Sequence, residues 1–230
     1  MARSKGRRAL RKMAFSAKRA SLPRMKRMAV MGTGLPQRVM VKHRYVQQIN
    51  IVNSAPQGTS VLAYSANGMF APTITGGTPN PHQPLYFDQY AALYDHYIVI
   101  GSKITFTVAN NTGAAAGAYC FTALLDDNSA LQSNDALEVS EQTQGRSLIT
   151  MAGNENDVKK VSLKYSAKKM FGGSILAKDE LQGSATTNPS ETSVFALVIS
   201  GAPGAGFNCY VTATVEYIAI WRELREVSQS

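Results

Sequence analysis

Fourteen basic side chains crowd the first 44 residues of this chain, and the chemistry they suggest is the binding of phosphate. No Asp or Glu lies among them, and the first acidic residue is Asp88. Arg and Lys pair with phosphate oxygens and release condensed counterions, so the affinity ignores base sequence and falls steeply with salt. The candidate nucleic-acid-binding residues are Arg3, Lys5, Arg7, Arg8, Arg11, Lys12, Lys18, Arg19, Arg24, Lys26, Arg27, Arg38, Lys42 and Arg44.

Charge divides the chain into a basic arm, residues 1–44, and a mildly acidic body, residues 45–230. The formal net charge of +9 separates into +14 on the arm and −5 on the body. Phe15 is the only aromatic residue before Tyr45, so the arm cannot bury enough apolar surface to order alone, and base stacking is not its main mode of binding. We expect a disordered arm that binds the phosphates of the nucleic-acid backbone and also serves as a nuclear localisation signal.

Residues with catalytic or metal-binding chemistry are scattered. His43, His82 and His96 have no partner at metal-ligand spacing, and His43 is expected only to add to the basic arm. Asp126 and Asp127 begin like a calcium loop but lack its glycine and distal glutamate. No serine nucleophile motif is present. We therefore predict a protein that is not an enzyme and needs no metal or cofactor.

The two cysteines, Cys120 and Cys209, each lie in an apolar alternating run. This position predicts small buried hydrophobic residues rather than a disulfide, in keeping with a reducing compartment. No stretch approaches the roughly 18 apolar residues of a membrane span. The N-terminus has charge but lacks the apolar run of a secretory signal.

The body alternates apolar and polar residues with the period of two that is typical of β-strands. The even positions Ile98, Ile100, Ile104, Phe106 and Val108 and the odd positions from Phe207 to Val215 are apolar. Residues 217–221 are apolar on both faces, which predicts a doubly covered region there. The predicted strands are 45–53, 59–64, 98–108, 118–125, 147–151, 158–165, 193–200 and 207–221. Eight short strands between turn-rich segments indicate a sandwich or jelly roll.

Two longer connections have helical patterns. One, 84–97, places tyrosines at spacings of three, four and seven residues, with Asp88 as its N-cap. The other is 134–142, capped by Asn134. The stripe of Tyr86, Tyr90, Leu93, Tyr94 and Tyr97 is expected to pack against the sheet or a neighbouring subunit, with nucleotide stacking as the alternative.

Two further segments have an ambiguous chemistry. Glycine-rich 201–206 is predicted to be a hairpin loop rather than a phosphate cradle, because no Lys-Ser/Thr pair follows it. A second basic cluster could line an interior, bind a polyanionic receptor or be a solvated strand face. Its members are Lys159, Lys160, Lys164, Lys168 and Lys169.

One segment carries a family resemblance. Residues 87–97, Phe-Asp-Gln-Tyr-Ala-Ala-Leu-Tyr-Asp-His-Tyr, lead into Ile-Val-Ile-Gly-Ser-Lys-Ile at 98–104. This run resembles the region before the fourth strand in capsid proteins of circular, Rep-encoding single-stranded DNA viruses, the circovirus-like group. The resemblance covers about 20 residues, and the arm here is shorter and richer in Ala, Met and Lys than circovirus arms.

The resemblance implies an all-β, eight-stranded single jelly roll of two packed four-stranded antiparallel sheets, with the body 45–230 as the shell domain. It implies self-assembly into a small icosahedral (T=1) virion around a circular single-stranded DNA genome, with the arm facing inward. It also implies a nuclear import receptor and a cell-surface receptor as host partners, and a place in the virion and the host nucleus.

The arm charge agrees with packaging in magnitude. Roughly 60 copies with 14 arm charges each supply about 800 to 900 positive charges, the same order as the roughly one to two thousand phosphates of a small genome. The alternatives are the capsid protein of a small RNA virus or satellite, since phosphate contacts ignore the sugar, and a non-viral nucleic-acid-binding β protein.

Overall fold

The computed structural model describes residues 34–55, 58–75, 82–110, 118–127, 147–151, 158–201 and 206–225. The chain divides into two compact units, Met1–Gly34 and Leu35–Ser230. Every helix and strand described below belongs to the second unit. The arm residues from Arg3 to Arg27 and the predicted helix 134–142 lie outside the described residues.

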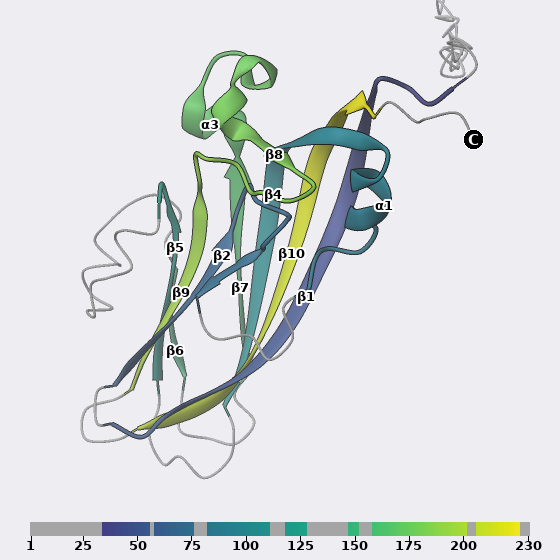
Figure 1. Cartoon of the computed structure of the whole chain (residues 1–230). Helices are drawn as coiled ribbons and strands as arrows, with labels where there is room; N and C mark the ends of the chain where they lie inside the picture. Colours follow the sequence, from purple (N-terminus) through teal and green to yellow (C-terminus); the bar gives the residue numbers. More distant parts are fainter. Residues whose placement is uncertain are drawn as a thin grey trace, which may run out of the picture. The chain divides into compact units, whose positions relative to one another are not determined.

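Two antiparallel sheets form the body (Figure 1). The first has the order β1-β10-β4-β7, and the short β8 also pairs with β4. Its strands are β1 (Arg38–Asn53), β10 (Phe207–Leu224), β4 (Tyr94–Asn110), β7 (Val158–Ser166) and β8 (Gln182–Ser184). The second has the order β3-β2-β9-β5-β6. Its strands are β3 (Thr73–Thr75), β2 (Thr59–Ser65), β9 (Val194–Gly201), β5 (Ala118–Leu125) and β6 (Ser147–Met151).

The strand order is that of a jelly roll. The chain passes from sheet to sheet, with β1, β4, β7 and β10 in one and β2, β5, β6 and β9 in the other. Apart from the three-residue strands β3 and β8, these are two four-stranded antiparallel sheets, which is the double Greek key of a jelly roll. The predicted fold class and all eight predicted strands are confirmed, with different ends for several strands.

The core lies between the two sheets, and the long strands of the first sheet bury one face in it. Odd positions of β10 from Phe207 to Val215 point into it, as predicted, and the buried face continues through Tyr217 and Trp221. Phe106 of β4 and Phe195 of β9 pack into the same cluster. This alternation is the physical reason that the strand pattern could be recognised.

A β-bulge in β4 corrects one predicted face. Val99 pairs with Ala219 and Gly101 pairs with Ile218, so Ile100 is an extra residue in β4. Tyr97 and Val99 therefore belong to the central core, whereas Ile98 does not. The prediction that Ile98 and Ile100 share a face with Ile104 is wrong, because the extra residue reverses the alternation.

The predicted helix over 84–97 is much shorter. Helix α1 spans Phe87–Ala91, and β4 already begins at Tyr94. Its N-cap is Tyr86, not Asp88, which lies in the first turn. Tertiary packing decides the difference, because Tyr94 and Tyr97 are buried as strand residues in the core. The helix α3 (Ala167–Phe171) and the 3-10 turns η2 (Ile175–Ala177) and η3 (Asp179–Leu181) follow β7.

Two other predictions are corrected. The segment 201–206 is not a hairpin loop, because it joins β9 to β10 and these strands belong to different sheets. The residues 217–221 are not covered on both faces, because Ile218 is 41% exposed. In both cases the local sequence predicts a strand or a turn. Which strands pair, and which strand faces are covered, depends on residues far away in the sequence.

Candidate nucleic-acid interface

Strand β1 carries the last part of the predicted arm. It begins at Arg38, seven residues before the predicted start, so Arg38, Lys42 and Arg44 are strand residues rather than part of a flexible tail. All three are exposed, while Val39, Val41 and His43 alternate with them and pack inward. The dense charge on the outer face obscured this alternation in the sequence.

His43 corrects a prediction of its own. It is 1% exposed and so contributes nothing to the basic surface. Its Nδ1 lies 3.1 Å from the Leu85 carbonyl oxygen, and the Trp221 indole N–H donates to Nε2 over 2.9 Å. Burial lowers the pKa of His43. It is a packing residue that links β1, β10 and the segment before α1.

The outer face of the first sheet aligns basic residues across its four strands. The register places Arg44 beside Glu216, Glu216 beside Lys103 and Lys103 beside Lys164. Each of these strands buries its alternate residues in the core, so the four side chains share the outer face. The row therefore carries three cations and one carboxylate.

The single carboxylate is held by its basic neighbours. Lys42 Nζ lies 2.8 Å from the Glu216 carboxylate. A hydrogen bond from Lys42, with further attraction from Lys42, Arg44 and Lys103, lowers the pKa of Glu216, and it remains ionised at neutral pH. Lys160 and Lys164, two rows apart on the exposed side of β7, form no ion pair with any described residue. The net charge of this face is positive.

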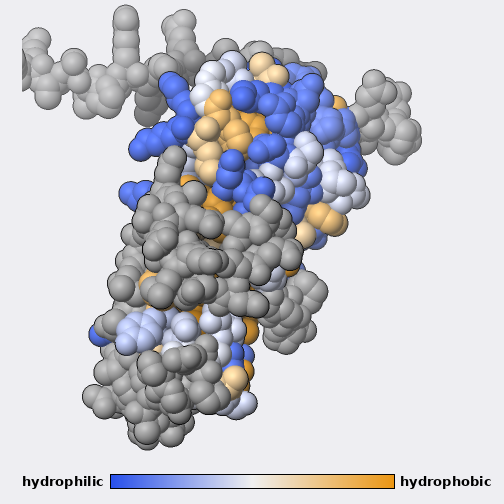
Figure 2. Space-filling model, turned by 90° about the vertical axis from the view of Figure 1, so that its left-hand side faces the viewer, coloured by the Kyte–Doolittle hydropathy of each residue, from blue (hydrophilic) through white to orange (hydrophobic). Residues whose placement is uncertain are grey.

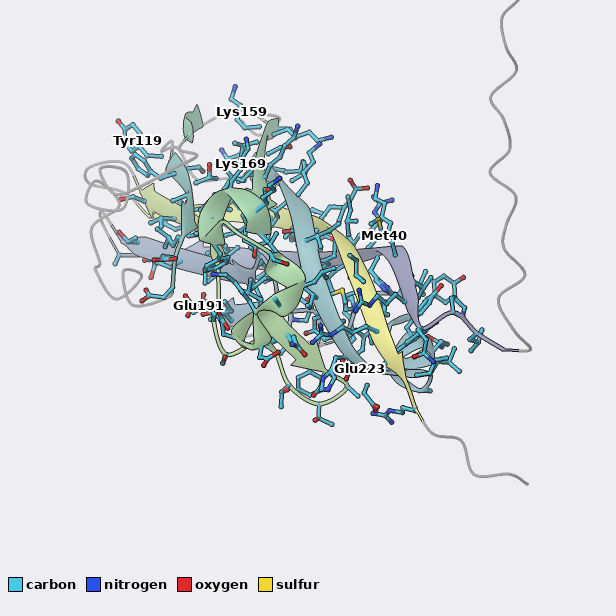
Figure 3. All side chains as sticks on the ribbon, turned by 90° about the horizontal axis from the view of Figure 1, so that it is seen from above. Met40, Tyr119, Lys159, Lys169, Glu191 and Glu223 are labelled. Atoms are coloured by element: carbon cyan, nitrogen blue, oxygen red, sulfur yellow. The ribbon has the colours of Figure 1, made fainter. Side chains whose placement is uncertain are left out.

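The predicted second basic cluster is divided by the strand alternation. Lys160 and Lys164 lie on the outer sheet face, whereas Lys159 alternates with them, and Lys168 and Lys169 are exposed on α3. Figure 3 shows Lys159 and Lys169 toward one side of the molecule and Glu191 and Glu223 toward the opposite side. The region at the top of Figure 2, where α3 lies, is mostly hydrophilic around a small hydrophobic patch.

We name Arg38, Lys42, Arg44, Lys103, Lys160 and Lys164 the basic sheet face. Its chemistry is phosphate binding, because these ammonium and guanidinium groups are accessible and directed to one side. Lys103 was not among the residues predicted from the sequence. Its outward position in an alternating strand was visible, but the strand order that aligns it with Arg44 and Lys164 was not.

Aromatic residues contribute little to this face. Tyr210 of β10, opposite Asn50 of β1, is exposed on it and could stack one base. Of the predicted tyrosine stripe, Tyr94 and Tyr97 are buried in the core and Tyr90 stacks on Trp221, with ring centroids 5.8 Å apart. Packing against the sheet is thus the main role of that stripe, with Tyr86 exposed.

The described residues offer little other chemistry. None of them gathers into a group of three or more His, Cys, Asp or Glu that could hold a metal ion. Cys120 and Cys209 are buried and are not joined in a disulfide, as predicted, and burial raises the pKa of each thiol to about 12. Among the helices that the structure describes, none has the length and apolar character of a transmembrane segment.

Comparison with known proteins gives structural likeness alone. No family model and no curated protein matches the chain. Desmodium yellow mottle tymovirus is 15% identical, covering 87% of this chain and 95% of its own, with a TM-score of 0.43. A decameric BFDV capsid protein is 10% identical, covering 81% and 99%, also at 0.43. Maize chlorotic mottle virus is 13% identical, covering 85% and 98%, again at 0.43. These values assign no family.

Proposed function

We propose that this chain is a viral capsid protein that self-assembles into a small icosahedral shell and packages a single-stranded genome through its basic residues. The observation that carries the proposal is the continuity of charge from the arm into the fold. The last basic residues of the arm, Arg38, Lys42 and Arg44, lie on the exposed side of β1, which continues across the sheet as the basic sheet face. A polyanion that follows the arm therefore meets a rigid basic surface.

The phosphate contacts of this proposal fall into two groups. The arm residues from Arg3 to Arg27 supply sequence-independent, salt-sensitive affinity. Arg38, Lys42 and Arg44 supply contacts from fixed positions on β1. Because side chains on one face of a strand repeat every two residues, or about 6.8 Å, the second group positions the backbone more rigidly than a free tail can.

We propose circular single-stranded DNA as the genome. The support is the resemblance of residues 87–104 to circovirus-like capsid proteins, and in this structure that run forms α1 and the first part of β4. The arm would then face the inside of a T=1 shell of about 60 copies. It would also direct the chain to the host nucleus, with an import receptor and a cell-surface receptor as partners.

Packaging is tested by comparing the full chain with a variant lacking residues 2–33, which keeps β1 intact. Both are treated with nuclease, viewed by electron microscopy and measured at 260 and 280 nm. We expect uniform particles with protected nucleic acid from the full chain, and a folded body with little protected nucleic acid from the variant. Equal packaging by both would refute the role of the arm.

The same particles decide the type of genome. Nucleic acid extracted from them is digested separately with DNase and with RNase. Sensitivity to DNase alone is the expected result, and sensitivity to RNase alone would favour the RNA-virus alternative. A chain that stays monomeric at every salt concentration and pH tested would favour a non-viral nucleic-acid-binding protein.

A further inference from the structure

Two hollows flank α1, and Tyr86 lies between them. One hollow, of about 470 Å³, is lined by residues that include Leu35, Pro36, Val39 and Leu93. A larger one, of about 810 Å³, lies on the side of Phe70–Thr75. Tyr86 lines both, and Leu85 and Tyr86 are 66% and 62% exposed. We call Leu85 and Tyr86 the apolar ridge and the smaller hollow the apolar groove.

The apolar ridge is held in place by bonds on both sides. The Leu85 N–H donates to the Arg44 carbonyl oxygen over 3.2 Å, and the Leu85 carbonyl faces His43. After Tyr86, Phe87 is buried against Trp221, with ring centroids 5.4 Å apart. Tyr86 itself has a φ of 67°, a left-handed conformation that is strained for a bulky residue. Its neighbours thus fix an aromatic side chain in solvent.

The apolar groove is also preformed. Val39 and Val41 pack against the core, and the Tyr94 hydroxyl on its floor donates to the Pro36 carbonyl oxygen over 2.8 Å. Tyr90 stacks on Trp221 behind it. None of its described lining residues carries a charge, so a polyanion finds no cation there. A rigid apolar hollow fits an apolar side chain of a protein partner.

We propose that the apolar groove receives the apolar ridge of a second copy of this chain across a two-fold axis. This inference rests on the proposed function, because a shell requires contacts between copies. The ridge and groove are adjacent and share Tyr86, so a two-fold pairing seats each ridge in the partner's groove. Fixed aromatic residues that enter preformed pockets are typical centres of such interfaces.

Charge complementarity supports the same partner. Asp88 is exposed beside the apolar ridge. Arg38 is exposed at the start of the edge strand β1, on the outer side of the strand from Val39 of the apolar groove. Neither Asp88 nor Arg38 forms an ion pair with any residue that the structure describes. In the two-fold pair, Asp88 of one copy meets the long Arg38 side chain of the other around the exposed edge of β1, and the contact occurs twice.

Charge reversal tests the pairing. Self-association of the nuclease-treated full chain is measured by sedimentation velocity at low salt for wild type, Asp88→Arg, Arg38→Asp and the double variant. We expect each single variant to weaken association by about tenfold or more, and the double variant to regain most of it. Loss of phosphate contacts cannot explain weaker association of Asp88→Arg, because that variant gains a cation and loses none. Failure of the double variant to recover would overturn the pairing.

Tyr86→Gly separates contact from stability. Glycine accepts a positive φ without strain, so the variant should unfold at the wild-type temperature or above it while its association weakens by about tenfold or more. Tyr119→Ser, at the one exposed residue of β5, is the matched loss of a half-exposed tyrosine and should associate like wild type.

Outcomes distinguish this inference from the proposed function. Wild type that forms particles while Tyr86→Gly and both charge reversals assemble equally well overturns the ridge-in-groove contact and leaves the capsid proposal standing. Wild type that never associates overturns both. The contact is supported if Tyr86→Gly associates more weakly than wild type and the charge-reversed double variant associates more strongly than either single charge reversal.

Discussion

The proton on His43 is fixed by its two neighbours. The Trp221 indole can only donate, so Nε2 of His43 must present its lone pair, and Nδ1 carries the hydrogen that faces Leu85. A second proton would place two N–H groups against each other. Tyr90 of α1 is the titratable group whose ring meets His43 edge-on, with centroids 5.5 Å apart. The fold therefore requires a neutral imidazole at this position.

Stability should fall as this histidine is titrated. Its folded-state pKa is lowered by burial, so below about pH 6.5 the unfolded chain binds the proton first. The contribution is complete above the unfolded pKa and is lost as the pH falls toward the folded one. Urea unfolding of the unassembled chain from pH 8 to pH 5 should show this loss.

His43→Gln provides the comparison for that experiment. We expect it to unfold about 1–3 kcal/mol more easily than wild type at pH 8, with the difference shrinking toward pH 5. His96→Gln, at a half-exposed histidine, is the matched control. If the difference in free energy of unfolding between His43→Gln and wild type stays constant with pH, the assignment of a neutral imidazole to His43 is contradicted.

The two thiols should be unreactive in the folded chain. Burial removes Cys120 and Cys209 from solvent and raises the pKa of both to about 12, which leaves almost no thiolate at neutral pH. A thiol reagent that absorbs on reaction should report no fast-reacting group in buffer and two in denaturant. Rapid labelling of the native chain would contradict this prediction and show that the core around Cys120 and Cys209 opens to solvent.

At the scale of the element, the basic sheet face should bind phosphate without the arm. Lys103→Gln with Lys164→Gln in the body lacking residues 2–33 should weaken binding to a single-stranded oligonucleotide by about tenfold at low salt, and less as salt rises. Arg225→Gln, whose guanidinium pairs with Asp95 over 2.9 Å, is the control that loses a cation elsewhere. If Arg225→Gln weakened oligonucleotide binding equally, the loss would be an effect of net charge and not of the basic sheet face.

Sequence patterns predicted the long strands of the first sheet well because one face of each is buried. Ala118–Leu125 and Ser147–Met151 in the second sheet also have the predicted bounds. The start of β1 was missed because its outer positions hold Arg and Lys, which masked the inward Val39 and Val41. Pairing partners were out of reach, since the row of Arg44, Lys103 and Lys164 exists only through strands distant in sequence. The candidate site was therefore predicted as a list of charges but not as a surface.

At the scale of the whole molecule, we propose a boundary between arm and body near Gly34, because β1 already begins at Arg38. Removal of residues 2–33 should leave a cooperative thermal transition, because β1 keeps all its pairs with β10. Removal of residues 2–44 takes seven residues of β1, including His43, and should lower the melting temperature by about 10 °C or abolish folding. Circular dichroism melts compare the two, and identical transitions would contradict this boundary.

The bulge at Ile100 lies between the part of β4 that contributes Tyr97 and Val99 to the core and the part that contributes Lys103 to the basic sheet face, which we propose contacts the genome. Toward one end of the strand Tyr97 and Val99 enter the core, and toward the other Lys103 leaves it, because one unpaired residue shifts the phase between them. Substitution of Ile100 leaves that phase unchanged. Deletion of Ile100 would remove the bulge and place Gly101 directly after Val99, so that their pairs with Ile218 and Ala219 become neighbours in a regular ladder, and Lys103 would stay outward and Ile104 inward. The chain at this point should thus tolerate both changes of residue type and the loss of one residue during evolution, because neither moves a side chain to the other face.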